Sequence, residues 1–202
     1  MIVTGIGTRY PSKQAFEMLF RIARRMALTG WELRSGGAIG CDTAWEHGFL
    51  PSEKKEIYLS RGTFGDSAKN AACGRISDYG DIWFEAEDIA SKLHPRWENL
   101  SESSQALHTR NVFQVLGLDL KSRTDVVAAY AAPSGFSVKG GTATAFNLAR
   151  AKGIPTYNLW TIEGQQNFFA FVLERMGLKD ESLLTVTSSK KSDGLSDFFE
   201  FS

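Results

Sequence analysis

Three glycine-containing stretches carry the residues that could bind or act on a ligand. They are Gly5-Ile6-Gly7-Thr8-Arg9, Ser35-Gly36-Gly37-Ala38-Ile39-Gly40 and Lys139-Gly140-Gly141-Thr142-Ala143-Thr144. Each follows an apolar run typical of a strand, and the third opens a helical pattern that runs to Lys152. Glycine lets the backbone approach a ligand closely, and a helix N-terminus offers free N–H groups and a positive dipole end. We therefore expect the three stretches to converge on one site for a phosphate or another anion.

The order of the apolar patterns predicts the elements that would hold these stretches in place. Strands are expected at 2–5, 31–35, 56–59, 126–131 and 154–159, and helices at 12–30, 42–48, 82–93, 103–118, 142–152 and 164–176. Alternating strands and helices indicate a mostly parallel sheet between two helical layers, which is a Rossmann-like three-layer α/β fold. All three glycine stretches would then lie at the carboxyl edge of the sheet, where such folds bind ligands.

The length of 202 residues indicates one domain, which we place at residues 1–178 and follow with a C-terminal tail at 179–202. Residues 61–105 are predicted to form an irregular, lid-like insertion, and the helix at 82–93 is the only regular element expected in it. This insertion contains Phe64, Tyr79, Trp83, Phe84 and Trp97. These aromatic residues either cover a ligand or pin the insertion onto the sheet. The acidic and aromatic end of the tail would dock on the body or recruit a partner.

The composition limits the class of partner. The chain carries 23 basic and 23 acidic residues, so its net charge of zero disfavours strong nonspecific binding of nucleic acid, although a local basic patch stays open. No apolar run is long enough to span a membrane and no signal peptide is recognisable, so a cytoplasmic location is expected. Cys41 and Cys73 have no metal-binding spacing, and we expect no metal and no cofactor. Cys41 lies beside a candidate binding loop and could be a reactive thiol.

The common nucleotide fingerprints are incomplete. Tyr10 occupies the place of the third glycine of a GxGxxG motif, and no acidic residue clearly ends the second strand to hold a ribose. A phosphate-binding GxxxxGK[ST] motif is also missing from the sequence. A standard nicotinamide dehydrogenase or ATPase is therefore disfavoured.

Asp42 and Glu46 are the candidate acidic residues at the expected site. Four residues apart at the start of a helix, they share one helix face. They could divide the roles of acid and base or bind ribose hydroxyls. Alternatively, Asp42 caps the helix and Glu46 is solvated or ion-paired. His47 and His108 are expected to be structural or surface residues.

Four motifs in a fixed order resemble those of a known superfamily. They are Ser35-Gly36-Gly37-Ala38-x-Gly40-x-Asp42, His108-Thr109-Arg110-Asn111, Gly140-Gly141-Thr142-x-Thr144 and Gly153-Ile154-Pro155. Over about residues 1–175 the chain resembles the SLOG superfamily, which unites Smf/DprA DNA-processing proteins, LOG phosphoribohydrolases and ligand-sensing domains of bacterial immune systems. It is most similar to small stand-alone members from phage and bacterial genomes, so a phage-encoded copy would work in the host cytoplasm.

The resemblance implies a set of ligand-binding residues. In the phosphoribohydrolases a PGGxGTxxE motif binds the phosphate, and its glutamate acts with an upstream arginine at the N-glycosidic bond. Here Ala143 replaces the third glycine, Asn147 stands at the glutamate position and Arg110 matches the arginine. Asn147 cannot act as a carboxylate base. The ligand-binding residues that follow are Gly5, Gly7, Thr8, Arg9, Ser35, Gly36, Gly37, Ala38, Gly40, Arg110, Asn111, Gly140, Gly141, Thr142, Thr144 and Asn147.

The functional hypothesis combines the anion site with the resemblance. We expect a protein that binds a nucleotide or nucleotide-sugar resembling ADP-ribose and that sequesters or degrades such a signal. One alternative is an N-glycosidase or phosphoribohydrolase with Asp42, Glu46 and Arg110 as catalytic residues. Another is a DprA-like mediator of recombination that binds single-stranded DNA. The resemblance also implies a homo-oligomer.

Overall fold

The computed structural model describes residues 1–49, 54–60, 72–74 and 80–176 of the 202-residue chain. Its centre is a six-stranded sheet in the order β4-β3-β2-β1-β5-β8, and every neighbouring pair of strands is parallel. The strands are β1 (Ile2–Gly7), β2 (Glu32–Ser35), β3 (Lys55–Tyr58), β4 (Ala72–Gly74), β5 (Val126–Tyr130) and β8 (Thr156–Asn158). The predicted Rossmann-like α/β fold is thereby confirmed.

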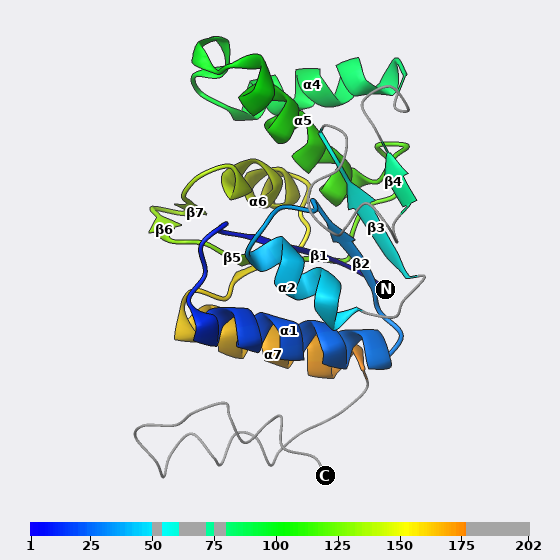
Figure 1. The fold of residues 1–202 in the computed structure, drawn as a ribbon, viewed down its shortest axis with the longest axis vertical. Helices are drawn as coiled ribbons and strands as arrows, with labels where there is room; N and C mark the ends of the chain where they lie inside the picture. Colours follow the sequence, from blue (N-terminus) through cyan, green and yellow to red (C-terminus); the bar gives the residue numbers. More distant parts are fainter. Residues whose placement is uncertain (50–53, 61–71, 75–79, 177–202) are drawn as a thin grey trace.

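Helices cover both faces of this sheet (Figure 1). One layer contains α1 (Lys13–Leu28), α2 (Cys41–Gly48) and α7 (Ile162–Arg175). The opposite layer contains α4 (Ile82–Leu93), α5 (Glu102–Leu116) and α6 (Thr142–Ala151). Two separate hydrophobic cores result, one around Leu19, Trp45 and Phe168 and the other around Phe113 and Leu148.

Short polar residues begin three of these helices. The side chains of Ser12, Ser101 and Thr161 accept hydrogen bonds from backbone N–H groups in the first turns of α1, α5 and α7. These caps fix where each helix starts relative to the strand before it. For α5 the cap matters most, because one face of this helix reaches the site described below.

The chain order creates a switch point in the middle of the sheet. From β1 the chain moves outward through β2 and β3 to β4, and it then returns to β5 on the other side of β1. The loops that leave the carboxyl ends of β1 and β5 therefore diverge. In open α/β sheets this divergence produces the crevice that binds ligands.

The segment 61–105 contains more regular structure than expected. The predicted helix at 82–93 is α4, and the segment also contains β4 and a short 3-10 helix, η2 (Trp97–Asn99). Trp83 is buried and its ring stacks on Phe113 at 6.0 Å, so it packs α4 onto α5. Phe84 is exposed. Phe64, Tyr79 and the tail at 179–202 lie outside the described residues.

A hairpin separates β5 from the third glycine stretch, where a direct turn was expected. Its strands are β6 (Pro133–Ser134) and β7 (Ser137–Val138), which pair antiparallel. The Ser137 hydroxyl bonds to the Asn147 amide oxygen on α6 at 2.7 Å. This contact ties the hairpin to the helix that follows it.

No helix in the described part of the chain is both long enough and apolar enough to cross a bilayer.

Candidate functional site

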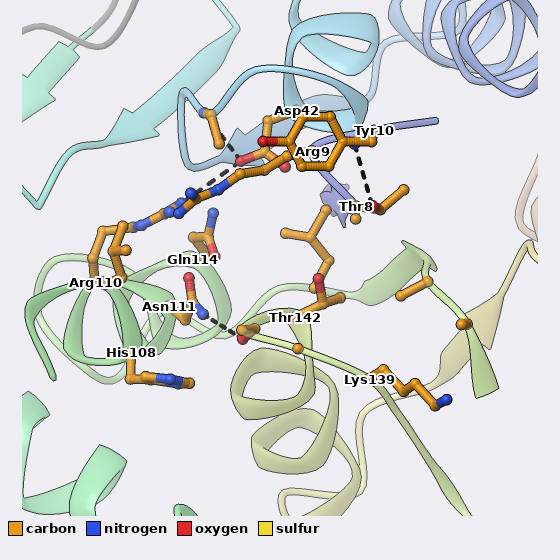
Figure 2. A pocket seen from close by; sticks show the side chains of 18 of the residues that line it. Thr8, Arg9, Tyr10, Asp42, His108, Arg110, Asn111, Gln114, Lys139 and Thr142 are labelled. Carbon is orange, nitrogen blue, oxygen red and sulfur yellow. Dashed lines mark hydrogen bonds and ion pairs between the residues drawn. The ribbon is translucent and has the colours of Figure 1, made fainter. Parts of the chain in front are cut away.

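A cavity of about 520 Å³ opens at the carboxyl edge of the sheet, beside the switch point between β1 and β5. Its walls are the loops after β1, β2, β5, β7 and β8, the N-terminal ends of α2 and α6, and one face of α5. Figure 2 shows Arg110 and Asn111 reaching in from α5, with Lys139 on the opposite side of the view. The cavity therefore lies where the parallel sheet predicts a ligand site.

The three glycine stretches do meet at this cavity, but only some of their residues face it. The predicted site residues that line it are Gly7, Thr8, Arg9, Ala38, Asp42, Arg110, Asn111, Gly140, Gly141 and Thr142. Those that are not among its lining residues are Gly5, Ser35, Gly36, Gly37, Gly40, Glu46, Thr144 and Asn147.

Several glycines are required by packing rather than by ligand approach. A Cβ on Gly5 would strike the indole of Trp45, and a Cβ on Gly36 would coincide with the Arg110 guanidinium. Gly40 has a φ of +89°, and a Cβ there would lie 2.6 Å from the carbonyl oxygen of Thr8. The second glycine stretch thus makes room for other parts of the protein.

Arg110 is held in a buried polar network between α5 and the loop after β2. Its Nη1 lies 3.7 Å from the Asp42 carboxylate, and both side chains are almost fully buried. The Gln114 amide is oriented so that its oxygen faces hydrogen-bond donors. In this orientation the Gln114 oxygen accepts hydrogen bonds from the Gly36 N–H at 2.7 Å and from Arg110 Nη1 at 2.8 Å. The Gln114 nitrogen then donates to Asn111 Oδ1 at 3.0 Å. The network thus connects the loop after β2 with the side of α5 that lines the cavity.

Asp42 and Glu46 do not act as a pair in the cavity. Asp42 accepts a hydrogen bond from the Ala38 N–H at 3.3 Å. Burial raises the pKa of the Asp42 carboxyl, while the charge of Arg110 and nearby backbone N–H groups oppose that rise. Glu46 is buried away from the cavity. Burial lowers the pKa of Lys55, and the negative charge of the nearby Glu46 opposes this shift.

The third stretch forms the open part of the site. Gly140 has a φ of +76°, and a Cβ on either Gly140 or Gly141 would meet no atom within 4 Å. The Asn111 side chain donates to the Gly141 carbonyl at 2.8 Å (Figure 2). The Ala143 and Thr144 N–H groups donate to the Gly140 and Gly141 carbonyls at 3.1 and 3.3 Å, so the N–H groups that would bind an anion here are those of Gly141 and Thr142. An anion could therefore approach the N-terminus of α6 without steric hindrance beside Thr142.

Thr144 and Asn147 have structural partners instead of a ligand. The Thr144 hydroxyl lies 2.6 Å from His108 Nδ1, and both residues are buried. Burial, together with the charges of His94 and Arg110, lowers the pKa of His108 to about 4. His108 is therefore neutral near pH 7. Asn147, at the position of the glutamate in the phosphoribohydrolases, bonds to the hairpin through Ser137.

Sequence reasoning missed several residues that line the cavity. They are Tyr10, Ser104, Leu107, Gln114, Ala131, Ala132 and Trp160, and His108 also lines it although it was assigned a structural role. Ile6 and Lys139 line it as well and belong to the predicted glycine stretches, but neither was given a binding role. Gln114 lies one helical turn after Arg110, and this spacing was the available signal. Trp160 follows β8 directly, and the carboxyl end of a strand was likewise a usable signal. His47 is exposed, as expected of a surface residue.

The candidate metal ligands of the described residues and the Cys41 thiol were located in the structure. No cluster of three or more His, Cys, Asp or Glu side chains occurs in this part of the chain. Cys41 is buried with its Sγ 3.8 Å from the Tyr130 carbonyl, and burial is the main cause that raises its pKa to about 12. The expectation of a reactive thiol at Cys41 is therefore wrong, because the thiolate is the reactive form.

Comparisons with known proteins define the fold. No protein-family model and no curated protein sequence matches the chain. Among solved structures, DNA processing protein A from Helicobacter pylori, described for its single-stranded DNA binding mode, is similar with a TM-score of 0.53 and 20% identity. The match covers 89% of this chain and 74% of that chain. The chain therefore shares the fold of DNA processing protein A.

Proposed function

We propose that the cavity binds a nucleotide or nucleotide-sugar, with a phosphate at the N-terminus of α6. The observation that carries the proposal is the open backbone at Gly140 and Gly141, where a Cβ on either residue would have no atom within 4 Å. The N–H groups and the positive end of α6 favour an anion at this place. Arg9 and Lys139, both exposed, line the same cavity and would add two mobile cations.

The charge and the size of the cavity support the same ligand class. Its lining contains three cationic side chains, Arg9, Arg110 and Lys139, against the single carboxylate of Asp42 among the described residues. This excess complements a phosphate, which carries close to two negative charges at pH 7. The volume of about 520 Å³ lies within the range of small-molecule sites, roughly 300–1,000 Å³.

Two measurements test the proposal. Native mass spectrometry of the protein purified from cells should show a retained nucleotide mass. Calorimetric titration with AMP and ADP-ribose should show binding that Lys139→Ala weakens about tenfold, since a charge-assisted hydrogen bond is worth about 1.5–3 kcal/mol. Lys152→Ala is the matched control, because Lys152 lies at the other end of α6. Failure of both nucleotides to bind would contradict the proposal.

The biological role is part of the same proposal. We place the chain in the SLOG superfamily, where a stand-alone binding domain would sequester or degrade a nucleotide signal. The shared fold and the order of the four motifs support this placement. A homo-oligomer is expected from the resemblance, and light scattering coupled to gel filtration measures the mass directly.

A second candidate function is binding of single-stranded DNA. The specific observation in its favour is the shared fold with a protein described for that binding mode. Against it stands the net charge of zero, because nonspecific affinity for nucleic acid depends on a basic surface. Fluorescence anisotropy with an oligo-dT at moderate salt decides between the two functions. Saturable binding of DNA that AMP does not displace would favour the second candidate.

Hydrolysis of an N-glycosidic bond is the third candidate. Of the predicted acidic residues only Asp42 reaches the cavity, and its carboxylate already contacts Arg110 and the Ala38 N–H. Its raised pKa would suit a general acid. Chromatography of AMP and ADP-ribose incubated with the protein should show no free base if the site only binds. Release of base that Asp42→Asn abolishes would establish the enzyme.

A further inference from the structure

One face of α5 forms a continuous wall of the cavity. Ser104, Leu107, His108 and Asn111 all line it, at the spacing that places side chains on one side of a helix. The wall presents, in order, a hydroxyl, an aliphatic side chain, an imidazole ring and an amide. None of the four carries a formal charge at pH 7, because His108 is neutral there.

The imidazole ring of this wall is held in place by its neighbours. The His108 ring is fixed by its 2.6 Å contact with the Thr144 hydroxyl on α6. The His94 ring packs against it with ring centroids 4.7 Å apart, and the Trp97 ring lies edge-on at 6.4 Å. His108 is 9% exposed, so these neighbours cover most of the residue and only a small part of it faces the cavity. A preorganised wall loses little entropy when a flat ligand group packs against it.

The wall is joined directly to the proposed phosphate site. Asn111, at one end of the wall, donates to the Gly141 carbonyl at the start of α6. Ser104, at the other end, lies seven residues away, which is roughly 10 Å along a helix axis. That span accommodates a ribose and a base that extend from a phosphate on α6. Of the cationic side chains that line the cavity, Arg9 and Lys139 lie on the loops after β1 and β7, and Arg110 on α5 is paired with Asp42.

We propose that the α5 wall is the nucleobase subsite of the cavity, with the base packed chiefly on Leu107, beside the small exposed part of His108, and its edge facing the Ser104 hydroxyl. The inference rests on the proposed function, because it assumes a phosphate at the N-terminus of α6. It adds that the base contributes affinity, so that a sugar phosphate without a base is a poor ligand. Trp160, which lines the cavity from the loop after β8 and is 45% exposed, is the competing place for a base.

The test compares two probes that share the phosphate and the ribose but differ in the base. Titration with AMP and with ribose 5-phosphate gives the ratio of their affinities, which should be at least tenfold in favour of AMP, given roughly 25 cal/mol per Å² of buried apolar surface. Leu107→Ala should lower this ratio about fivefold. The control is Leu118→Ala, because the exposed Leu118 lies just beyond the end of α5 and outside the cavity lining, and it should leave the ratio unchanged. Trp160→Ala tests the competing place for the base and should lower the ratio less than Leu107→Ala does.

The outcomes separate this inference from the proposed function. If the wild-type protein binds neither probe, the phosphate site itself is refuted. If both probes bind with equal affinity, or if Leu107→Ala weakens them equally, the α5 wall is not the base subsite and the inference is overturned. A ratio that falls in Trp160→Ala and not in Leu107→Ala would overturn it as well, by placing the base at Trp160. Circular dichroism of each variant verifies that it is folded.

Discussion

Replacing Gly141 by alanine should remove ligand binding while leaving the fold intact. Gly141 has ordinary helical dihedral angles, φ −59° and ψ −26°, so alanine adopts its conformation without strain. A Cβ at this residue meets no atom within 4 Å. Reduced entropy of the unfolded chain would stabilise the variant by about 0.4–1 kcal/mol. Replacing the glycine at the helix N-cap by alanine would destabilise the folded protein by a similar amount, so the two effects on the free energy of unfolding roughly cancel.

The effect on binding should be much larger than the effect on stability. The new methyl group would occupy the space through which a phosphate reaches the first N–H groups of α6. Losing two charge-assisted hydrogen bonds, each worth about 1.5 kcal/mol or more, corresponds to about a hundredfold weaker binding. The net stability change of less than about 1 kcal/mol would shift the melting temperature by no more than roughly 4 °C.

Calorimetry with AMP and a thermal melt of the same Gly141→Ala sample measure both quantities. The comparison variant is Gly140→Ala, since Gly140 has a φ of +76° and alanine is strained there. It should lose stability in addition to binding. Wild-type affinity in a folded Gly141→Ala protein would refute the phosphate site at α6. A melting temperature lowered by about 10 °C or more would refute the open geometry of this loop.

Three further predictions concern packing and protonation. Gly36→Ala should displace the Arg110 guanidinium from Asp42 and lower the free energy of unfolding by on the order of 3 kcal/mol, measured by urea unfolding. A decrease below about 1 kcal/mol would contradict the buried network. His108 has a folded pKa of about 4, below its usual 6.5, so its contribution to stability is complete above pH 6.5 and declines as the pH falls towards 4. The decline should be on the order of 2 kcal/mol, and His108→Asn should flatten the curve of unfolding free energy against pH relative to wild type. Cys41 should resist iodoacetamide at pH 8 in the native protein, because its raised pKa keeps it in the unreactive thiol form. Rapid alkylation of Cys41, detected by peptide mass spectrometry, would contradict its burial.

The order of strands and helices was predictable because it depends on local patterns. Apolar periodicity located the strands and helices of the described region except the shortest ones. The alternation of strands and helices then implied the parallel sheet and its ligand edge. The hairpin at 133–138 was missed, since strands of two residues have no periodicity to detect. The same limit applies to β4, which has three residues.

The individual roles of the glycines were not predictable in the same way. Gly36 and Gly141 look alike in sequence, yet one accommodates Arg110 and the other faces open space. The difference depends on a residue that lies 74 positions further along the chain from Gly36. The role of Thr144 likewise depends on His108, which comes from another helix. Such assignments require the tertiary structure, because the partners are distant in sequence.

The central claim is that the N-terminus of α6 binds the phosphate of a nucleotide. The most direct measurement is a titration of the ¹⁵N-labelled protein with AMP, followed by the amide signals of Gly140, Gly141 and Thr142 in NMR spectra. The account predicts that these three signals shift together and saturate with one binding constant, while the amide of Lys152 at the far end of α6 stays in place. Saturable binding of AMP that leaves the three signals unchanged would contradict it.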